Sequence, residues 1–403
     1  MELFWLEHKK LWRKKIVKIC VLLCFVYCVI FGSILSFQWF CFGSSDDYTS
    51  AFGNNFDGYT VIKDSQEYAL SFGGELTDET LQKIVSDYQQ MEADGMGEEL
   101  EKTDWQIVNS WLGTLYPELR DTSNYKTMIS YVDPDKLTGF YERRQQVLDE
   151  FLEVSGQVGA EKEFLHQIER KVEKPFRYEW VEGWSMLLGS MVADLGVVMA
   201  LFLGIVLSSL FAGEWHDNTS TLVLTTRNGW GKIALAKILT GFAFTVELFA
   251  LLAVSSIISQ LFFMGTAGWD MPIQNIKLIA VAPMNMLQAE IYEYAFVLLG
   301  AIGFAGIVMF ISAAVKNNVL TLLLSLAVVY GPMMIAEYLP YEMQKALDLI
   351  PLVGSSTDIF RTNTFRIFGK LIWSPYLLIT IPVLIGILCM PFAIKSWSRR
   401  MKA

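Results

Sequence analysis

The chain has 403 residues, of which 53% are hydrophobic, and its formal net charge at pH 7 is −10. A hydrophobic fraction of this size, gathered in long runs with few charges, excludes an ordinary soluble enzyme and indicates an integral membrane protein. The negative charge gives no support to nucleic-acid binding, because the acidic residues gather in one polar insert and the basic ones flank the apolar runs.

Each apolar run must form a helix, because lipid offers no partner to a free backbone N–H or C=O group. A bilayer core about 30 Å thick needs roughly 20 apolar residues per span. By this measure we predict six transmembrane helices at residues 17–39, 184–211, 233–264, 294–314, 319–337 and 372–394. The expected fold class is an all-α polytopic membrane protein with six transmembrane helices and a large, mainly helical extracellular domain between helices 1 and 2.

The N-terminal segment, residues 1–16, mixes apolar and basic side chains before the first span. Phe4, Trp5 and Trp12 fall on one side of a helix while lysines occupy other positions, which is typical of an amphipathic helix at a membrane surface. A cleaved signal peptide is the alternative, but the run at 17–39 is too long and no small-residue cleavage site closes it. We therefore predict an interfacial helix followed by a retained span.

The first span carries three cysteines that recur every four residues along one helical face: Cys20, Cys24 and Cys28. A metal site would need a further ligand, and no His or carboxylate shares the span. We interpret the thiols as a stripe of small packing residues and expect no metal site.

Residues 43–183 form the polar insert, in which acidic residues outnumber basic ones by about two to one. The insert contains no cysteine, so it must fold around its own core. Thr77 is predicted to cap a helix, and Tyr59–Ile62 to form a short strand. Apolar stripes at helical spacing predict buried positions in four helices: Leu81, Ile84, Tyr88 and Met91; Trp105, Val108, Trp111, Leu112 and Leu115; Phe140, Val147, Phe151 and Val154; Phe164, Ile168 and Val172.

The insert shows no spacing that catalysis demands, such as His-Glu-x-x-His or a nucleophile elbow. We therefore expect a binding or gating domain and no catalytic residue in this chain.

Positively charged residues resist translocation, so flanks rich in Lys and Arg mark the cytoplasmic side of a membrane. Such residues occupy the N-terminus, the segment 212–232, the turn at Lys316 and the tail 395–403. We expect a multi-pass protein of the plasma membrane with both termini in the cytoplasm. The insert, the loop 265–293 and an extracellular or re-entrant segment at 338–371 are then expected outside.

Polar and small residues inside the spans suggest two further roles. Asp194 and Glu247 lie within apolar runs, where a charge costs about 2.5–3.5 kcal/mol, so each is expected to face the bundle interior, protonate or pair. Lining a substrate path and purely structural pairing both remain open for them. Gly300, Gly303 and Gly306 recur every three residues in the fourth predicted span and indicate close helix packing.

The segment joining the second and third spans is long and patterned rather than merely polar. It begins with Phe211 and Glu214, continues through Thr219, Thr221, Leu222 and Leu224, and ends with Arg227, Lys232 and Lys237. This order resembles that of permease subunits of ABC-2 type exporters, in particular Gram-positive permeases for antimicrobial peptides or drugs. Asn218 stands where the family pattern has Gly, and Arg227 where many members have Pro.

The resemblance implies that this segment couples the permease to an ABC ATPase subunit. Glu214 would begin the coupling segment, and the threonines and leucines would seat on the ATPase. Arg227, Lys232 and Lys237 would hold the segment at the membrane surface. The alternative is an ordinary cytoplasmic loop whose charges only set the orientation of the chain.

No nucleotide-binding motif accompanies the resemblance, because Gly231-Lys232 is followed by Ile233 and lacks the phosphate-binding loop of a Walker A sequence. ATP and Mg²⁺ are therefore expected on a separate ATPase chain, with no cofactor bound here. The family also implies a second permease copy or a related permease as partner within the lipid bilayer.

A different class of function shares this layout. A membrane-anchored receptor or secretion accessory, with an ectodomain that binds a partner, would show nearly the same hydropathy. An intramembrane enzyme is a third and weaker reading, because no paired carboxylates or histidine cluster shares a span.

Overall fold

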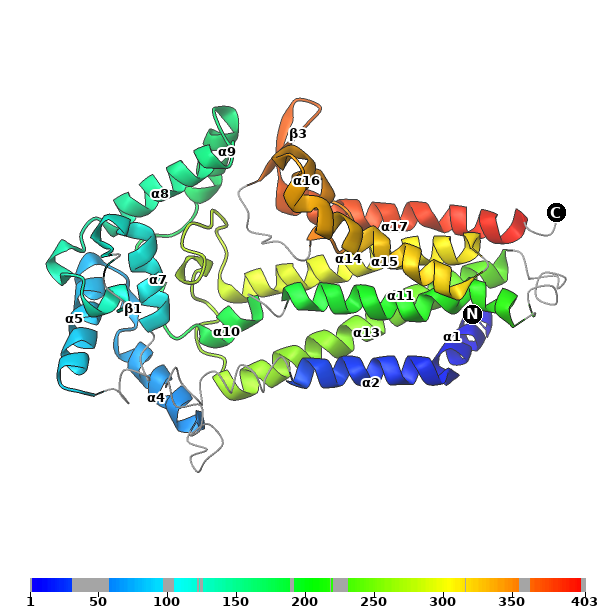
Figure 1. The fold of residues 1–403 in the computed structure, drawn as a ribbon, viewed down its shortest axis with the longest axis horizontal. Helices are drawn as coiled ribbons and strands as arrows, with labels where there is room; N and C mark the ends of the chain where they lie inside the picture. The colour runs from blue at the N-terminus through cyan, green and yellow to red at the C-terminus, as the bar shows by residue number, and fades with distance from the viewer. Residues whose placement is uncertain are drawn as a thin grey trace.

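We describe the chain from a computed structural model, which describes residues 2–30, 58–96, 105–121, 123, 126–188, 192–217, 219, 231–315, 317–354 and 363–399. Figure 1 shows an elongated molecule in which long helices run along the main axis and shorter helices cluster at one end. Both termini lie at the opposite end of the long helices. The described part is mostly helical.

Five helices in the described residues are long and apolar enough to cross a membrane. They are α11 (Val192–His216), α13 (Lys232–Met264), α14 (Met286–Ala314), α15 (Asn318–Ile335) and α17 (Ser374–Arg399). With a rise of 1.5 Å per residue, α13 is about 50 Å long and exceeds a bilayer core of about 30 Å. The chain is thus a helical polytopic membrane protein.

The N-terminal segment breaks into two helices, α1 (Glu2–Arg13) and α2 (Lys15–Val29). Helix α2 covers part of the predicted first span, residues 17–39, and the rest of that span lies outside the described residues. A sixth membrane-crossing helix, at the N-terminus, therefore stays a prediction. Cys20, Cys24 and Cys28 are all buried, at 2%, 0% and 1% exposure, on the face of α2 that packs in the bundle.

The insert is built from short helices and one pair of very short strands. Its helices are α4 (Gly58–Ser71), α5 (Asp78–Ala93), α7 (Trp105–Leu115), α8 (Phe140–Val154), α9 (Ala160–Glu169) and α10 (Glu182–Met186). Strand β1 (Gly74–Glu75) pairs antiparallel with β2 (Arg177–Tyr178), so the two ends of the insert meet. Short 3₁₀ helices occupy Pro117–Leu119, Met128–Ser130 and Pro134–Lys136.

Several sequence predictions for the insert can be compared with these elements. Thr77 caps α5 as predicted, because its hydroxyl accepts a hydrogen bond from the backbone N–H of Thr80 at 3.2 Å. The buried stripes of α5 and α7 are confirmed at Leu81, Ile84, Trp111 and Leu112, among others. The predicted strand at Tyr59–Ile62 is wrong, since these residues belong to α4.

The predicted stripe along α8 is wrong by one position at its C-terminal end. Phe151 and Val154 are 39% and 89% exposed, while Leu148 and Leu152 are fully buried. The buried face of α8 consists of Phe140, Arg144, Leu148 and Leu152, so it includes a charged residue at 0% exposure. The predicted stripe contained apolar residues only and did not include Arg144.

Arg144 joins the insert to the loop between α13 and α14. Its guanidinium contacts a carboxylate oxygen of Glu169 at 2.6 Å, and it donates hydrogen bonds to the carbonyl oxygens of Leu278 at 2.7 Å and Ala280 at 3.1 Å. Burial alone would raise the pKa of Glu169, but the hydrogen bonds and charges of Lys174 and Arg144 prevail and lower it. The insert is therefore held to this loop by hydrogen bonds from a buried arginine whose charge is paired with Glu169.

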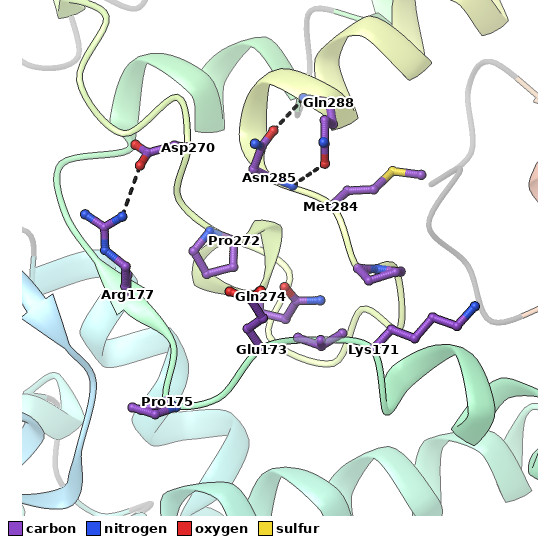
Figure 2. Close-up of a pocket in the computed structure, with 12 residues that line it drawn as sticks. Lys171, Glu173, Pro175, Arg177, Asp270, Pro272, Gln274, Met284, Asn285 and Gln288 are labelled. Atoms are coloured by element: carbon purple, nitrogen blue, oxygen red, sulfur yellow. Dashed lines mark hydrogen bonds and ion pairs between the residues drawn. The ribbon is translucent and has the colours of Figure 1, made fainter.

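Further polar contacts surround this junction. Trp111 donates its indole N–H to the carbonyl oxygen of Asn275 at 2.9 Å, and Trp180 donates to that of Met264 at 3.0 Å. Figure 2 shows the ion pair between Arg177 and Asp270 at the same junction. The loop itself contains a short 3₁₀ helix, Ile273–Asn275.

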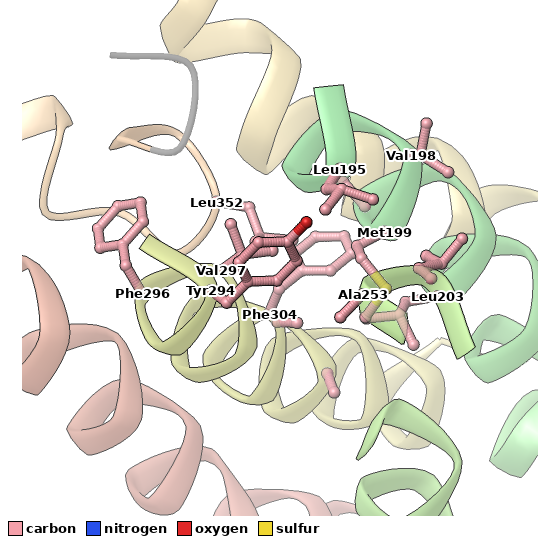
Figure 3. Packing of buried hydrophobic residues seen from close by; sticks show 14 of the residues in the cluster. Leu195, Val198, Met199, Leu203, Ala253, Tyr294, Phe296, Val297, Phe304 and Leu352 are labelled. Carbon is pink, nitrogen blue, oxygen red and sulfur yellow. The ribbon is translucent and has the colours of Figure 1, made fainter. Parts of the chain in front are cut away.

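Helix α14 lies at the centre of the bundle and packs against α11, α13, α15 and α17. Figure 3 shows Leu195, Met199 and Leu203 of α11 beside Tyr294 and Phe304 of α14. These side chains form part of one large apolar core.

The glycine stripe of α14 explains its close approach to α17. A Cβ atom at Gly303 would lie 2.3 Å from the carbonyl oxygen of Pro382, and one at Gly306 would lie 2.6 Å from the Cα atom of Gly386. Gly300 faces Leu352 instead, at 3.1 Å for the same construction. The predicted role in close helix packing is confirmed.

The segment between α15 and α17 folds back onto the bundle. It contains the 3₁₀ turn Ala336–Tyr338, helix α16 (Tyr341–Leu347) and a hairpin of β3 (Thr364–Ile367) and β4 (Lys370–Trp373). Phe368 and Gly369 both have positive φ, as a two-residue hairpin turn requires. The hairpin also touches the insert, because Thr364 donates a hydrogen bond to Gln157 at 2.8 Å.

Candidate functional site

Glu214 is the centre of a charged cluster at the end of the bundle that carries both termini (Figure 1). Its side chain is 4% exposed, although it is a carboxylate. Lys10 and Lys237 donate hydrogen bonds to its Oε1 atom at 2.6 and 2.8 Å, and the hydroxyl of Thr219 donates to Oε2. A buried charge of this kind is tolerated only when it is paired and hydrogen-bonded.

Lys237 extends the cluster from α13 to the N-terminal helix. Its ammonium group is 2% exposed and contacts both Glu214 and Glu7, each at 2.8 Å. Because Glu7 and Lys10 belong to α1, the cluster ties together α1, α11 and α13. We call these four residues, with Thr219, the Glu214 cluster.

Two lysines near the cluster show how uneven its electrostatics are. Burial opposes the charge of Lys10, but the hydrogen bond and charge of Glu214 outweigh it and raise the pKa of Lys10. Burial, together with the positive charges of Lys237 and Lys10, lowers the pKa of Lys14, whose ammonium donates to Ser209 at 2.9 Å. Lys14 therefore sits at the break between α1 and α2 in a site that disfavours its charge.

The end of α11 also contacts α14 and α17, through Phe211, the first residue of the predicted coupling pattern. Phe211 is fully buried and packs on Trp397 of α17, with ring centroids 5.4 Å apart. The hydroxyl of Ser312 in α14 accepts hydrogen bonds from the backbone N–H groups of Phe211 and Ala212, both at 3.1 Å, and donates to the carbonyl oxygen of Ser208 at 2.7 Å. The end of α11 is thus fixed against α14 and α17 as well.

The structure places the predicted coupling residues as follows. Glu214 and Thr219 are brought together, whereas Lys232 is the exposed first residue of α13. The predicted loop 212–232 is shorter than expected, because α11 continues to His216 and Glu214 lies within its last turn. The remaining residues lie outside the described part of the chain: Thr221, Leu222, Leu224 and Arg227.

The two predicted intramembrane carboxylates differ from each other. Asp194 lies near the start of α11, but its side chain is outside what the structure describes. Glu247 does not face the bundle interior: its side chain is 42% exposed and meets His8 at 3.2 Å and the indole N–H of Trp12 at 3.0 Å. Pairing was expected, but the partners come from α1, which had been placed on the membrane surface.

Sequence reasoning missed a second carboxylate, Glu290, which is 3% exposed in α14. Its carboxylate interacts with the hydroxyl of Tyr294, whereas the amide of Gln260 in α13 has no hydrogen-bond partner among the described residues. Ser256 lies one helical turn before Gln260 in α13, and Tyr294 lies one turn after Glu290 in α14. The hydroxyls of Ser256 and Tyr294 are hydrogen-bonded to each other at 2.7 Å. Glu290 was missed because the fourth span had been started at Tyr294, inside the helix.

A sequence signal for the earlier start was present. Asn285 and Gln288 form a capping box, in which each side chain accepts a hydrogen bond from the backbone N–H of the other residue, at 2.8 and 3.2 Å. Reading Asn-x-x-Gln as a helix start would have placed Glu290 inside α14.

Comparison of the chain with protein-family models, with curated proteins and with solved structures finds no match in any of the three.

Proposed function

We propose that this chain is the permease subunit of an ABC exporter, driven by an ATPase on a separate chain. It would act with a second copy or a related permease in the plasma membrane, with both termini in the cytoplasm, and move a peptide, drug or lipid-like cargo outward. The observation that carries the proposal is the Glu214 cluster.

The cluster supports coupling because of where it lies. Residues 217–231 connect α11 and α13, and Glu214 and Lys237 lie close to the two ends of that connection. Their ion pair, with Glu7 and Lys10 of α1, links the connection to three helices at once. A push on the connection would therefore reach α1, α11 and α13 together.

A simple anchor has less need of such a cluster. Burying Glu214 and Lys237 costs desolvation energy that their attraction must offset, and an apolar pair of similar volume often serves stability as well or better. A receptor whose helices only hold it in the membrane would gain little from this arrangement. The cost of burying this pair favours the exporter over the receptor or secretion accessory.

Co-purification tests the proposal directly. The full-length chain, tagged and extracted from its own membranes after mild cross-linking, is expected to bring down a protein with a Walker A motif. Leu224→Arg should weaken this association, whereas Arg170→Glu, on the exposed surface of the insert, should not. Retention of the ATPase by the Leu224 variant, or its absence from the wild-type sample, would support the receptor instead.

Thiol labelling tests the orientation on which the proposal depends. In a chain with its exposed native thiols replaced by serine, Thr221→Cys should react with an impermeant reagent in inside-out vesicles and stay unlabelled on intact cells. Val158→Cys, at a 57% exposed position of the insert, should show the opposite pattern. Labelling of the Thr221 variant from the medium would rule out a cytoplasmic coupling segment.

A further inference from the structure

A pocket lies where the insert meets the loop between α13 and α14 (Figure 2), at the end of the molecule opposite α1 (Figure 1). Its volume is about 290 Å³, at the lower limit for sites that hold small molecules. It is therefore suited to one side chain or one chain terminus. Three prolines and a methionine supply apolar walls: Pro175, Pro272, Pro283 and Met284.

Most polar groups of the pocket already have partners in the structure. Arg177 pairs with Asp270 at 3.1 Å, and Asn285 and Gln288 bond each other in the capping box. The amide nitrogen of Gln274 donates to the carbonyl oxygens of Ala280 and Ala282 at 3.0 and 2.9 Å. These bonds fix the orientation of the Gln274 amide.

Two acceptors that line the pocket, one on a buried and one on an exposed side chain, have no partner in the described part of the chain. Gln274 is 0% exposed, and its Oε1 atom has no hydrogen-bond partner among the described residues. The carboxylate of Glu173 likewise has no hydrogen bond or ion pair in the described part of the chain. Figure 2 shows Glu173 and Gln274 next to each other, with Pro272 beside them.

Neither of these groups can satisfy the other, because an ionised carboxylate and an amide oxygen both only accept hydrogen bonds. Lys171 also lines the pocket, but Figure 2 shows its side chain extending away from Gln274. No positively charged donor of the pocket therefore contacts Gln274 Oε1 or the Glu173 carboxylate in the described part of the chain. An ammonium group has three N–H donors that could do so.

We propose that this pocket binds a primary ammonium group, from a lysine side chain or a peptide N-terminus, through the Glu173 carboxylate and Gln274 Oε1. The apolar walls would hold the carbon chain next to that group. This inference is independent of the proposed export function, since it concerns binding to the insert without nucleotide or partner.

Calorimetric titration of the full-length chain in nanodiscs tests the proposal with three probes that share an unbranched four-carbon side chain. Nα-acetyl-lysine methylamide carries only the side-chain ammonium, norleucine amide carries only the α-ammonium, and Nα-acetyl-norleucine methylamide carries neither. We expect one or both ammonium compounds to bind about ten- to a hundredfold more tightly than the third, as a charge-assisted hydrogen bond allows. Whichever compound binds more tightly identifies the source of the ammonium.

Variants then assign the binding to the pocket. Glu173→Gln should lower the affinity for the ammonium compound about tenfold or more, while Glu163→Gln, an exposed glutamate of α9 outside the pocket, should leave it unchanged. Because Glu173 is exposed, its variant should unfold at the same temperature as the wild type. Lys171→Ala should leave or raise the affinity.

Three results would overturn the proposal. The first is no binding of either ammonium compound at millimolar concentration, which would leave water as the partner of Gln274. The second is equal binding of all three probes, and the third is a loss of affinity in Lys171→Ala with none in Glu173→Gln, which would indicate an anionic ligand.

Discussion

Replacing Arg144 with methionine removes the buried charge that holds the insert to the bundle while keeping a side chain of comparable length. The carbonyl oxygen of Leu278 would lose the hydrogen bond it accepts from this guanidinium. The carbonyl oxygen of Ala280 would still accept from Gln274, and Glu169 would keep Lys174 at 2.8 Å. The loss of folding stability is therefore large, but the bonds from Gln274 and Lys174 reduce it.

The magnitude follows from these remaining contacts. Breaking a buried ion pair by removing one partner costs about 3–5 kcal/mol, and an unsatisfied buried carbonyl alone costs about 1–3 kcal/mol. Because Lys174 and Gln274 remain, we expect the lower end, about 3 kcal/mol, for Arg144→Met. The neighbouring Arg143 provides a matched control, since its ion pair with Glu118 is partly exposed and should contribute about 1 kcal/mol or less.

Denaturant unfolding of the full-length chain in mixed micelles, followed by tryptophan fluorescence, would measure both values. Trp111 lies in the junction and reports its opening. A double-mutant cycle of Arg144→Met with Glu169→Gln should give a coupling energy above about 1 kcal/mol. A loss for Arg144→Met no larger than for Arg143→Met would refute the claim that the buried Arg144 holds the insert to the loop between α13 and α14.

Three further predictions concern the bundle and the effect of acid. Glu214→Gln and Lys237→Met should each lower the free energy of unfolding by about 3 kcal/mol, because each breaks the same buried ion pair. The double variant should lose less than the sum of the two single losses. Additive losses in denaturant unfolding would contradict this prediction. Gly306→Ala should cost about 1–3 kcal/mol, because its Cβ atom would lie 2.6 Å from α17, whereas Gly331→Ala, with nothing within 4 Å, should change the unfolding free energy by less than about 1 kcal/mol. The lowered pKa of Glu169 means that its stabilisation is present above its ordinary pKa of 4.5 and is lost as pH falls through the folded value. Acid titration of wild type should therefore show a loss of stability below about pH 4.5 that is smaller in Glu169→Gln.

Hydropathy and local patterns determined a large share of the fold. Runs of about 20 apolar residues must be helical in lipid, so the long helices α11, α13, α14, α15 and α17 were predictable from composition alone. Local chemistry also placed the Thr77 cap and the glycine contacts of α14. The cap and the spans depend on neighbouring residues or on the solvent, and the glycine spacing predicted close packing without identifying α17 as the partner.

Local pattern failed where charged residues are buried. The predicted stripe of α8 did not include Arg144, which is buried, and Glu214 was assigned to a loop although it lies in the last turn of α11. Pairing was one of the three outcomes expected for Glu247, but the sequence did not indicate that its partners come from α1. For these residues the type of side chain does not predict its position, because a charged group can be buried only where a partner of opposite charge or a hydrogen-bond partner is available.

Those partners are distant in the sequence. Lys10 and Glu214 are separated by 204 positions, and Arg144 reaches a carbonyl 134 positions away. The periodicity of a helix says nothing about contacts at such separation, and desolvation makes a buried charge unfavourable until the partner arrives. The sequence alone therefore determined which segments form long apolar helices, while the tertiary structure decided where the charges, and with them the candidate sites, are assembled.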